Sequence, residues 1–560
     1  MNYKLARDPK EVAEYTRDSD FLFLDTETTG LDAKKERIRL LQVKSPKQKI
    51  PILADLFLMQ KENLMEAFKG KTLIFHNAKF DLSFLGRYLG KDILQNKIHD
   101  TFIAGKVFEL SKKHSLKAMV KNHLSIEMEK ESQVSDWSSN LTEKQLTYAA
   151  NDVIYLEELF YQLNKKYNLK ERIYALETAF IPLLVKMEID GIHFDFRKAL
   201  VFLEEKKEKY YNLKEDLQED YGVDALSYKS VASALVREGV ELPKTAKGNH
   251  STKEDILKFI DHEIASKVIE VRKLKKEIEL LEAYIKSSDD DSRIHSTFNS
   301  WKTVSGRLSS EDPNIQNVPR KKEFRELFGS KEGYFMVGAD YPQIELRIAA
   351  VYTKDKTMIE AFKKGIDLHK LTVSKIMDIP YEEVTDEMRQ LGKPINFGAL
   401  YGMSAKTLME YSESKYGVKM SYEEAKTFLK KYKQTYKGIA EWHDKTIRKI
   451  RKNGHINTET LMGRKMYSKR FTDALNHPIQ GTGADMIKLA VIYFNKLCQK
   501  FNIDAKIVNI IHDEILVETN NPEKASKILK KAMELSAEKL IPEIPCPVEA
   551  KIGKNWYEVK

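Results

Sequence analysis

Three short apolar segments of this chain each end close to a carboxylate. They are residues 21–24 (FLFL) before Asp25, residues 334–339 (YFMVGA) before Asp340, and residues 507–511 (IVNII) shortly before Asp513. Apolar runs of this length are typical of buried strands. A charged residue at the end of such a strand leaves the core, where its burial would be costly. The pattern therefore predicts acidic sites at strand ends, one at Asp25 and a second formed by Asp340 and Asp513.

The length and the order of the predicted elements indicate several domains. At roughly 150 residues per domain, the 560 residues correspond to three or four domains. Strand-like runs followed by helical patterns predict an α/β or α+β domain over about residues 1–165. Helical periodicity dominates residues 171–290 and 350–500. We therefore expect a multidomain protein of mixed α/β and α+β class.

The composition excludes several classes of protein. Apolar residues make up 42% of the chain, which is too many for a disordered protein. The two cysteines, Cys498 and Cys546, cannot form a disulfide framework. We find no apolar leader segment and no run of about 18 apolar residues. The sequence thus argues against membrane, secreted and fibrous proteins, and favours a soluble protein of a reducing compartment.

The net charge permits a polyanionic partner without requiring one. There are 94 Lys and Arg residues against 84 Asp and Glu, a surplus of +10. Residues 264–287 have helical periodicity and a basic face formed by Lys267, Arg272, Lys273, Lys275 and Lys276. Such a face can follow a phosphate backbone, or it can simply be a solvated helix surface. Composition alone leaves both interpretations open.

The first acidic group has the residues that a two-metal phosphodiesterase needs. Asp25 and Glu27 are two apart on a predicted strand and therefore share a face. The pairs Asn77/Asp81 and Tyr148/Asp152 are each four apart, which places each pair on one helix face. Divalent cations prefer carboxylate oxygens, and a phenol can orient the attacking water. Ordinary surface acids are the alternative for each motif alone, but three motifs in this order argue against it.

A second group combines strand-end acids with a helical stripe. Arg389, Lys393, Phe397 and Tyr401 follow one another at a spacing of four, which aligns them on one helix face. Cations followed by aromatic rings suit a nucleoside triphosphate, with phosphates and base respectively. An amphipathic helix with its aromatic residues in the core is the other interpretation of this stripe.

The first group resembles the three motifs of DEDD-type 3′-5′ exonucleases of the tyrosine-containing branch. The resemblance covers about residues 20–160 and implies an RNase H-like fold. It implies that Asp25, Glu27, Asp81 and Asp152 hold two metal ions and that Tyr148 positions the water. Since no catalytic position is lost, we expect an active exonuclease.

From about residue 20 to the end, the chain resembles the family-A DNA polymerases in their large-fragment form. The motifs that carry this resemblance are Ser305–Ser310 (SGRLSS), Asp312–Asn317 (DPNIQN), Asp340–Arg347 (DYPQIELR), Gly365–His369 (GIDLH), Thr460–Arg464 (TLMGR), Gln480–Asp485 (QGTGAD), His512–Glu514 (HDE) and Gly553–Trp556 (GKNW). The resemblance implies an exonuclease domain over residues 1–165 and a right-hand polymerase domain over 166–560. Within the latter we expect a thumb at about 191–290, fingers at about 350–474, and a palm built from about 166–190, 291–349 and 475–560.

The resemblance also assigns roles to single residues. Asp340, Tyr341 and Asp513 would bind two Mg²⁺, with Mn²⁺ as a substitute, and Glu514 would be an auxiliary acid. Lys393 would protonate the leaving group and Glu345 would be the steric gate against ribonucleotides, held by Tyr401. The remaining residues implied to contact the dNTP are Gln343, His369, Arg389 and Phe397. Those implied to contact DNA are Arg307, Asn314, Gln316, Asn476, Gln480 and His512.

The expected function is templated DNA synthesis with 3′-5′ proofreading on primer-template DNA and dNTPs. A nuclease whose second half only binds DNA and a translesion-type polymerase of the same family are the alternatives. Asp340, Asp513 and Lys393 argue against the first, and the intact exonuclease motifs argue against the second. We expect a monomer without a 5′-nuclease domain, cytoplasmic and nucleoid-associated if bacterial. A phage or organellar origin and the accessory replication partners stay open.

Two prolines depart from the family pattern. Pro342 replaces the usual serine after Asp340-Tyr341. Pro394 follows Lys393 within the predicted helix, where it removes the donor for the Gln390 carbonyl, at a cost of about 3 kcal/mol. We therefore predict a kink or a local opening of the helix near residues 390–394, and a shifted energy balance when the fingers close.

Overall fold

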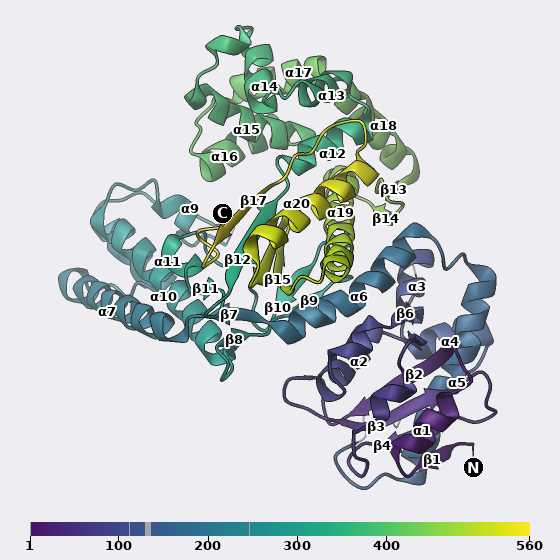
Figure 1. Cartoon of the computed structure of the whole chain (residues 1–560). Helices are drawn as coiled ribbons and strands as arrows, with labels where there is room; N and C mark the ends of the chain where they lie inside the picture. The colour runs from purple at the N-terminus through teal and green to yellow at the C-terminus, as the bar shows by residue number, and fades with distance from the viewer. Residues whose placement is uncertain (1, 111, 129–135, 246) are drawn as a thin grey trace.

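A six-stranded mixed sheet forms the centre of the amino-terminal part of the computed structural model, which describes residues 2–110, 112–128, 136–245 and 247–560 (Figure 1). The strand order is β1-β4-β3-β2-β5-β6, with β2 antiparallel to β3 and parallel to β5. The strands are β1 (Lys4–Ala6), β2 (Phe21–Thr28), β3 (Ile38–Lys44), β4 (Ile52–Asp55), β5 (Thr72–Phe75) and β6 (Lys97–Asp100). Leu22, Phe23 and Leu24 are fully buried. The apolar run therefore places β2 inside the sheet and carries Asp25 to the end of the buried segment.

Helices of this part position the other acids. They are α1 (Pro9–Thr16), η1 (Leu64–Ala67), α2 (Ala78–Tyr88), η2 (Lys91–Gln95), α3 (Thr101–Phe108), α4 (Leu116–Leu124) and α5 (Glu143–Lys166). Asp152 lies on the buried face of α5 among Ala149, Val153 and Leu156. The expectation that Asn77 and Asp81 share a helix face is wrong. Asn77 has a φ of 72° and precedes α2, and its backbone amide donates to Asp100 Oδ1 at 3.0 Å.

Helix α6 (Arg172–Asp190) lies between the amino-terminal part and the rest of the chain (Figure 1) and belongs to two hydrophobic cores. Tyr174, Ile181 and Val185 pack into the core of the amino-terminal part, while Leu176 and Phe180 pack into the larger core of the remaining chain. The same helix therefore connects the two parts.

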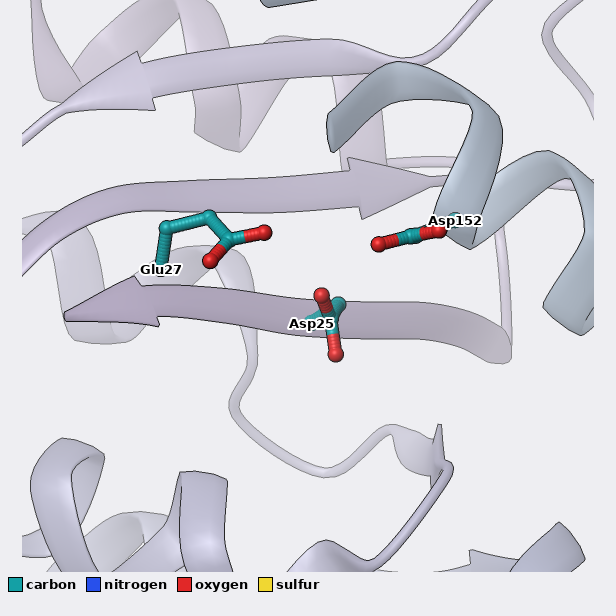
Figure 2. A group of neighbouring side chains, drawn as sticks. All are labelled: Asp25, Glu27 and Asp152. Atoms are coloured by element: carbon teal, nitrogen blue, oxygen red, sulfur yellow. The ribbon is translucent and has the colours of Figure 1, made fainter. Parts of the chain in front are cut away.

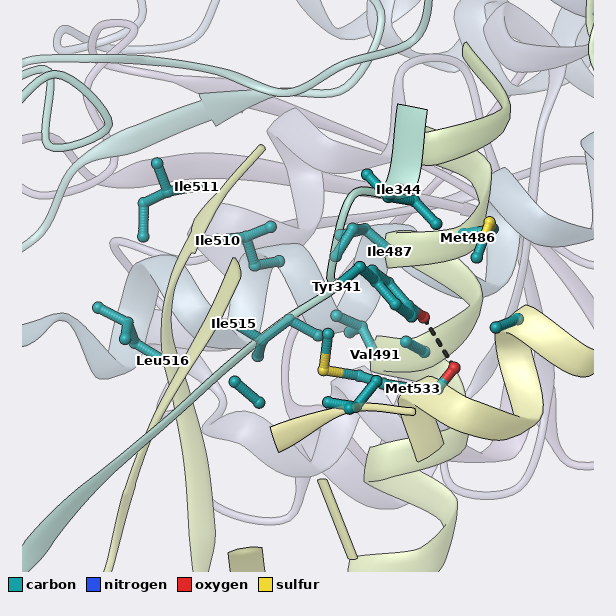
Figure 3. Close-up of a cluster of buried hydrophobic side chains, with 14 of the residues drawn as sticks. Tyr341, Ile344, Met486, Ile487, Val491, Ile510, Ile511, Ile515, Leu516 and Met533 are labelled. Atoms are coloured by element: carbon teal, nitrogen blue, oxygen red, sulfur yellow. Dashed lines mark hydrogen bonds between the residues drawn. The ribbon is translucent and has the colours of Figure 1, made fainter. Parts of the chain in front are cut away.

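An antiparallel sheet carries the second acidic group. Its order is β15-β16-β12-β17, formed by β15 (Ala505–Ile511), β16 (Glu514–Thr519), β12 (Phe335–Asp340) and β17 (Glu549–Gly553). Helix α20 (Pro522–Leu540) packs on β12 and β17, and α19 (Phe471–Phe501) packs against α20 and contributes Met486, Ile487 and Val491 to the same core. Figure 3 shows the core between them, in which the Tyr341 hydroxyl donates to the Met533 carbonyl at 2.9 Å. Short elements complete this part: β7 (Ile192–Phe194), β8 (Arg293–Ile294), β9 (Thr297–Asn299), β10 (Ser309–Glu311), α11 (Lys322–Arg325) and β11 (Phe328–Gly329).

Two long helices form an arm with a small core of its own. The arm contains α7 (Phe196–Tyr221), α8 (Tyr228–Arg237), α9 (Glu254–Leu257) and α10 (Glu263–Ser287). Two residues of the basic face of α10 bind partners within the arm. Lys267 pairs with Glu263 at 2.9 Å, and the Arg272 guanidinium donates to the carbonyls of Ala225 and Thr252. These two cations therefore stabilise the arm itself.

Between β12 and β15, the chain folds into a group of helices and one hairpin. It comprises α12 (Ile344–Thr353), α13 (Lys356–Lys363), α14 (Leu368–Met377), η3 (Tyr381–Glu383), α15 (Asp386–Leu400), α16 (Ala405–Tyr416), α17 (Tyr422–Thr435), α18 (Lys437–Asn453) and the hairpin β13 (Ile456–Glu459) and β14 (Lys465–Ser468). No helix in the described ranges is long and apolar enough to cross a membrane.

The predicted opening of the helix near residues 390–394 is wrong. Helix α15 continues through Pro394 from Asp386 to Leu400. Tertiary packing explains the difference: Gly392 lies so close to α14 that an added Cβ would come within 2.4 Å of the His369 carbonyl oxygen. Pro394, Ile395 and Asn396 are also buried. Packing of this segment offsets the cost of the lost hydrogen bond.

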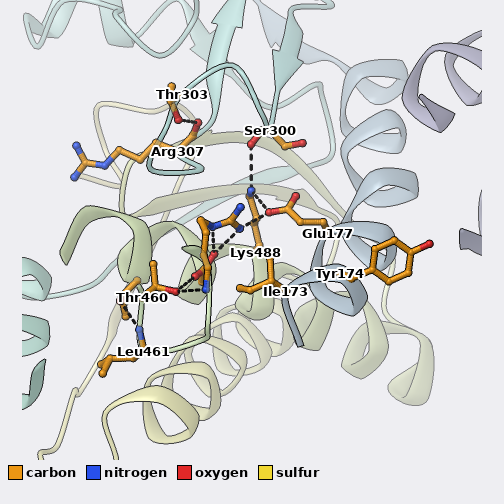
Figure 4. Close-up of polar contacts among 12 residues, drawn as sticks. Ile173, Tyr174, Glu177, Ser300, Thr303, Arg307, Thr460, Leu461 and Lys488 are labelled. Carbon is orange, nitrogen blue, oxygen red and sulfur yellow. Dashed lines mark hydrogen bonds and ion pairs between the residues drawn. The ribbon is translucent and has the colours of Figure 1, made fainter. Parts of the chain in front are cut away.

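A buried network of charges joins α6, the turn after β13 and α19 (Figure 4). The Glu177 carboxylate accepts from Lys488 Nζ at 2.6 Å and from the Arg464 guanidinium. Arg464 also donates to Asp485 Oδ1 from Nε at 2.9 Å and from Nη2 at 2.6 Å. All four side chains are at most 2% exposed. Each charge is therefore held by an opposite charge, as burial requires.

Removing one member of this network should be strongly destabilising. We expect Arg464→Ala to lower the free energy of unfolding by about 3–5 kcal/mol, because Glu177 and Asp485 would stay buried with too few cations. Urea unfolding of the metal-free chain measures this change. Arg470→Ala, which removes an exposed arginine, should cost less than about 1 kcal/mol. Equal losses in the two variants would contradict a structural role for the network.

Candidate active sites

Three carboxylates converge at the end of the buried part of β2 (Figure 2). Asp25 and Glu27 come from β2 and Asp152 from α5, and one ligand oxygen from each lies within 4.8 Å of the others. Asp152 is buried, whereas Asp25 and Glu27 are partly exposed. The strand alternation thus brings the two predicted β2 acids to one point, and α5 supplies the third acid from more than a hundred residues away.

The other two predicted residues of this site lie beside the group. Asp81 is buried in α2, and its Oδ1 accepts a hydrogen bond from Thr26 Oγ1 at 2.8 Å. The Tyr148 phenol lies against the Asp152 carboxylate, and burial first, then this neighbouring carboxylate, raise the pKa of the phenol. The hydroxyl therefore stays protonated and can donate a hydrogen bond.

Burial and mutual repulsion act on all four acids. Burial raises the pKa of Asp25 to about 7. Burial first, and then the neighbouring carboxylates, raise the pKa of Glu27 and Asp81 well above the usual range, and Asp152 behaves in the same way. Like charges this close cannot all ionise unless a cation compensates them.

The donor set fits hard divalent cations. All available donors are carboxylate oxygens, which Mg²⁺ and Mn²⁺ prefer. Asp152 Oδ1 is buried and has no hydrogen-bond partner among the described residues. An unpaired buried carboxylate oxygen that faces two further carboxylates is suited to a metal ion.

The second acidic site is built on neighbouring strands. Asp340, the last residue of β12, lies directly opposite Glu514, the first residue of β16. Lys560 Nζ lies 3.0 Å from Asp340 Oδ2 and 3.1 Å from Glu514 Oε2. The buried Trp556 donates from Nε1 to Glu514 Oε1 at 3.1 Å. The two carboxylates therefore already converge on one cation, which supports their fit to metal ions.

Asp513 sits in the turn between β15 and β16. Burial raises the pKa of its carboxyl to about 6, with Lys560 acting in the opposite direction. The backbone carbonyl of Asp513 accepts from the Tyr341 amide at 3.2 Å, which joins the two acidic segments. Because the Tyr341 side chain is buried and bound to Met533, only its backbone carbonyl could face a metal ion.

The predicted stripe lies on α15, but its members have different partners. Arg389 Nε donates to Asp367 Oδ2 at 2.9 Å. Lys393 has no ion-pair partner among the described residues, so its ammonium is available to a ligand. Phe397 packs near His369, with ring centroids 6.1 Å apart. Tyr401, which ends the helix, donates its hydroxyl proton to Glu345.

A buried asparagine fixes the protonation of His369. Asn396 Nδ2 lies 3.0 Å from His369 Nδ1, and Thr372 Oγ1 donates to Asn396 Oδ1 at 2.9 Å. Because the amide nitrogen donates, Nδ1 accepts and the ring proton is placed on Nε2. Burial lowers the pKa of His369 to about 4, so the ring is neutral near pH 7.

Glu345 is held from two sides. Arg307 Nη2 donates to Glu345 Oε1 at 2.6 Å, and Tyr401 donates to the other carboxylate oxygen. The prediction that Tyr401 helps to hold Glu345 matches this contact. Gln343, directly before α12, has a φ of 51° and starts the turn into the helix that carries Glu345.

Most residues expected to contact DNA lie close to one another. Arg307, Gln316 and His512 line one small cavity. Gln316 Nε2 donates to the Ile510 carbonyl at 2.7 Å, while Asn314 Oδ1 accepts the Gln316 amide. Gln480 and Asn476 are one turn apart on α19, with Gln480 Nε2 3.5 Å from Asn476 Oδ1. The contacts of these residues with DNA remain predictions.

Sequence reasoning missed Lys560, Asn396 and the Glu177–Arg464–Asp485–Lys488 network. Only Asn396 had a local signal, because it lies between Lys393 and Phe397 on the predicted helix. Lys560 binds Asp340, and Glu177 binds Arg464, across more than 200 positions of the chain, and no periodicity points to such partners.

Two family models match the chain. The model described as DNA polymerase family A matches residues 200–558, and the model described as 3′-5′ exonuclease matches residues 4–168. The chain therefore belongs to DNA polymerase family A and carries a 3′-5′ exonuclease domain. This confirms the predicted family, the predicted fold class and the expectation of an enzyme.

Similar proteins agree with this assignment. DNA polymerase I of Aquifex aeolicus is 39% identical, with coverage of 98% of this chain and 97% of that protein. DNA polymerase I of Pseudomonas aeruginosa is 26% identical over 97% of this chain, and the thermostable DNA polymerase I of Thermus aquaticus is 32% identical over 72% of it. The matches cover 64% and 51% of these two longer proteins. A solved structure of the POL domain of Pol1 from M. smegmatis, in complex with DNA primer-template and dNTP, matches 99% of this chain with a TM-score of 0.82 and 25% identity.

The raised carboxyl pKa values predict a pH dependence of stability. In the metal-free protein Asp25 is protonated up to about pH 7 when folded, but ionises near pH 4 when unfolded. The stability contributed by this group is present below about pH 4 and is lost as the pH rises through about 7. We expect Asp25→Asn to raise the melting temperature in chelator at pH 8 more than at pH 5. Asp18→Asn, which changes an exposed acid, serves as the control. A parent and a variant that differ equally at both pH values would contradict the prediction.

Proposed function

We propose that this protein is a DNA-templated DNA polymerase that extends a primer 3′ end with dNTPs and trims it with its 3′-5′ exonuclease. The observation that carries the proposal is the presence of two separate carboxylate sites, on the β2 and the β12/β16 strands, in a chain of family A. The complex of the M. smegmatis neighbour with primer-template and dNTP supports the substrates. The proposed limits are residues 1–165 for the exonuclease and 166–560 for the polymerase, with palm, fingers and thumb as given above.

The polymerase site is proposed to use Asp340, Asp513 and the Tyr341 carbonyl as ligands of two Mg²⁺, with Glu514 as auxiliary acid. Bound there, the ions would lower the pKa of the primer hydroxyl and stabilise the leaving pyrophosphate. Lys393, whose ammonium pairs with no carboxylate in the part of the chain that the structure describes, donates a proton to the leaving group. The exonuclease site is proposed to bind two ions through Asp25, Glu27, Asp81 and Asp152, with the Tyr148 hydroxyl orienting the water.

Residues of the helical group are proposed to select and hold the nucleotide. His369 Nε2–H donates to a phosphate oxygen, and Arg389, Phe397 and Gln343 form further contacts with the dNTP. Glu345 excludes a ribose 2′-hydroxyl, because Arg307 and Tyr401 leave its carboxylate no freedom to move away. Arg307, Gln480 and His512 test the minor-groove acceptors common to all correct pairs.

A primer-template assay with Mg²⁺, with and without dNTPs, tests both activities. We expect Asp340→Ala to reduce extension by at least about 10³-fold while trimming continues, since only the polymerase metals lose a ligand. Asp25→Ala should reduce trimming by a similar factor while extension continues. Loss of both activities in either variant would contradict the proposal of two separate sites. Trimming without extension by the parent would favour a nuclease with a DNA-binding second half.

The contact of Asn396 with His369 gives a second test. In Asn396→Asp the new carboxylate accepts a hydrogen bond from Nδ1–H, so the neutral ring has no proton left on Nε2 and only the imidazolium keeps one there. We therefore expect the KM for dNTP to rise by about tenfold where the ring is neutral, and to vary with pH near 6–7 as the ring titrates. The parent should show no such dependence, because its imidazole is neutral there. Steady-state kinetics from pH 5.5 to 8.5 measures both, with Gln390→Ala on the exposed side of α15 as the control. Parallel pH profiles of the parent and Asn396→Asp would contradict the role of Asn396.

A further inference from the structure

A cavity of about 990 Å³ lies between the exonuclease domain and the carboxyl-terminal end of α19. Its walls come from η2, β6, α5, α6 and α19, together with the connection between α5 and α6. None of the carboxylates or nucleotide-binding residues described above lines it. The cavity is therefore separate from both active sites.

Apolar side chains form much of the lining and are open to solvent. Phe21 and Tyr161, at its edge, remain 44% and 48% exposed. Ala175 and Ala179 are exposed one helical turn apart on α6. Their small side chains leave the space that a larger residue would fill. Exposed apolar surface that surrounds a cavity indicates a binding site more often than scattered exposed apolar residues do.

Helix α6 lacks one of its backbone hydrogen bonds beside the same cavity. Pro182 lies inside α6 and has no amide hydrogen, so the carbonyl of Thr178 lacks its usual helical donor. Both residues line the cavity. A ligand with an N–H group could satisfy this carbonyl.

Unpaired lysines surround the apolar lining. Lys97, Lys170, Lys186 and Lys496 line the cavity, and none has a carboxylate within ion-pair distance in the part of the chain that the structure describes. Lys91 also lines it but is paired with Asp190. Asp92 is the acid among the lining residues. The cavity therefore carries a net positive charge that, among the described lining residues, Asp92 offsets only in part.

We propose that this cavity is a docking site for an extended acidic peptide segment of a partner protein, one that contains a bulky apolar side chain. The four unpaired lysines come from four different parts of the fold, so they match carboxylates spread along a chain better than one compact phosphate. The space beside Ala175 and Ala179 accepts the apolar side chain, and the Thr178 carbonyl accepts a peptide N–H. An apolar centre with a charged rim is the usual arrangement of a peptide-binding site.

The proposal goes beyond polymerase and exonuclease activity and is tested with the full chain. The probe is a short fluorescein-labelled peptide of consecutive Asp and Glu residues ending in Leu-Phe, with binding followed by fluorescence anisotropy. We expect saturable binding that weakens with salt, because the rim charges are solvent-exposed. The same peptide with Lys in place of the acids should not bind.

Two kinds of variant locate the binding site. Lys170→Glu combined with Lys496→Glu reverses two rim charges, and Ala179→Phe fills the space on α6. Each should weaken peptide binding by about tenfold or more. Lys165→Glu combined with Lys500→Glu makes the same charge change at exposed positions of α5 and α19 outside the cavity, and should bind normally. Melting temperature and extension of a bare primer-template should stay at the parent level in all variants.

Three outcomes would overturn the proposal. They are an absence of peptide binding by the parent, equal weakening in the cavity and control charge reversals, and normal binding by Ala179→Phe together with the double reversal. A labelled oligo-dT that binds the parent, loses binding in the cavity variants and displaces the peptide would also overturn it, and would identify the cavity as a single-strand DNA site instead.

Discussion

Repulsion among carboxylates is the constraint that both sheets have to overcome. Leu22, Phe23 and Leu24 of β2 and most apolar residues of β12 and β16 are buried, and they hold acidic side chains at the strand ends nearer to one another than these would lie in water. The two sites compensate this repulsion differently. The β12/β16 acids have the Lys560 ammonium between them, whereas no cation among the described residues pairs with the Asp25 group, and burial raises the pKa of Asp25 to about 7.

Much of this arrangement follows from local sequence patterns. The apolar runs predicted the buried strands, the two-residue spacing predicted that Asp25 and Glu27 converge, and the four-residue spacing predicted the stripe on α15. These inferences need only the geometry of one strand or one helix. The roles of the residues needed more, because a run of acids does not distinguish a metal site from a solvated surface. The family resemblance supplied that distinction.

The wrong predictions and the missed residues have a common physical cause. Proline inside a helix is unfavourable by itself, but the close approach of Gly392 to the His369 backbone keeps α15 continuous. Asn77 adopts a left-handed conformation because Asp100, on another strand, binds the amide there. Lys560, Asn396 and Glu177 act through partners distant in sequence. Tertiary packing decides each of these positions, and no local pattern records it.

Helix α6 has a consequence for how two opposed reactions share one chain. Its residues are embedded in both hydrophobic cores, and its Glu177 forms buried ion pairs with Lys488 and Arg464 of the polymerase part of the chain. Rotating one half of the molecule against the other would thus expose apolar side chains and separate buried ions. A primer 3′ end that passes from the polymerase site to the exonuclease site must therefore move between two sites whose relative position is fixed. The probability that an error is removed then depends on how readily that end separates from its template.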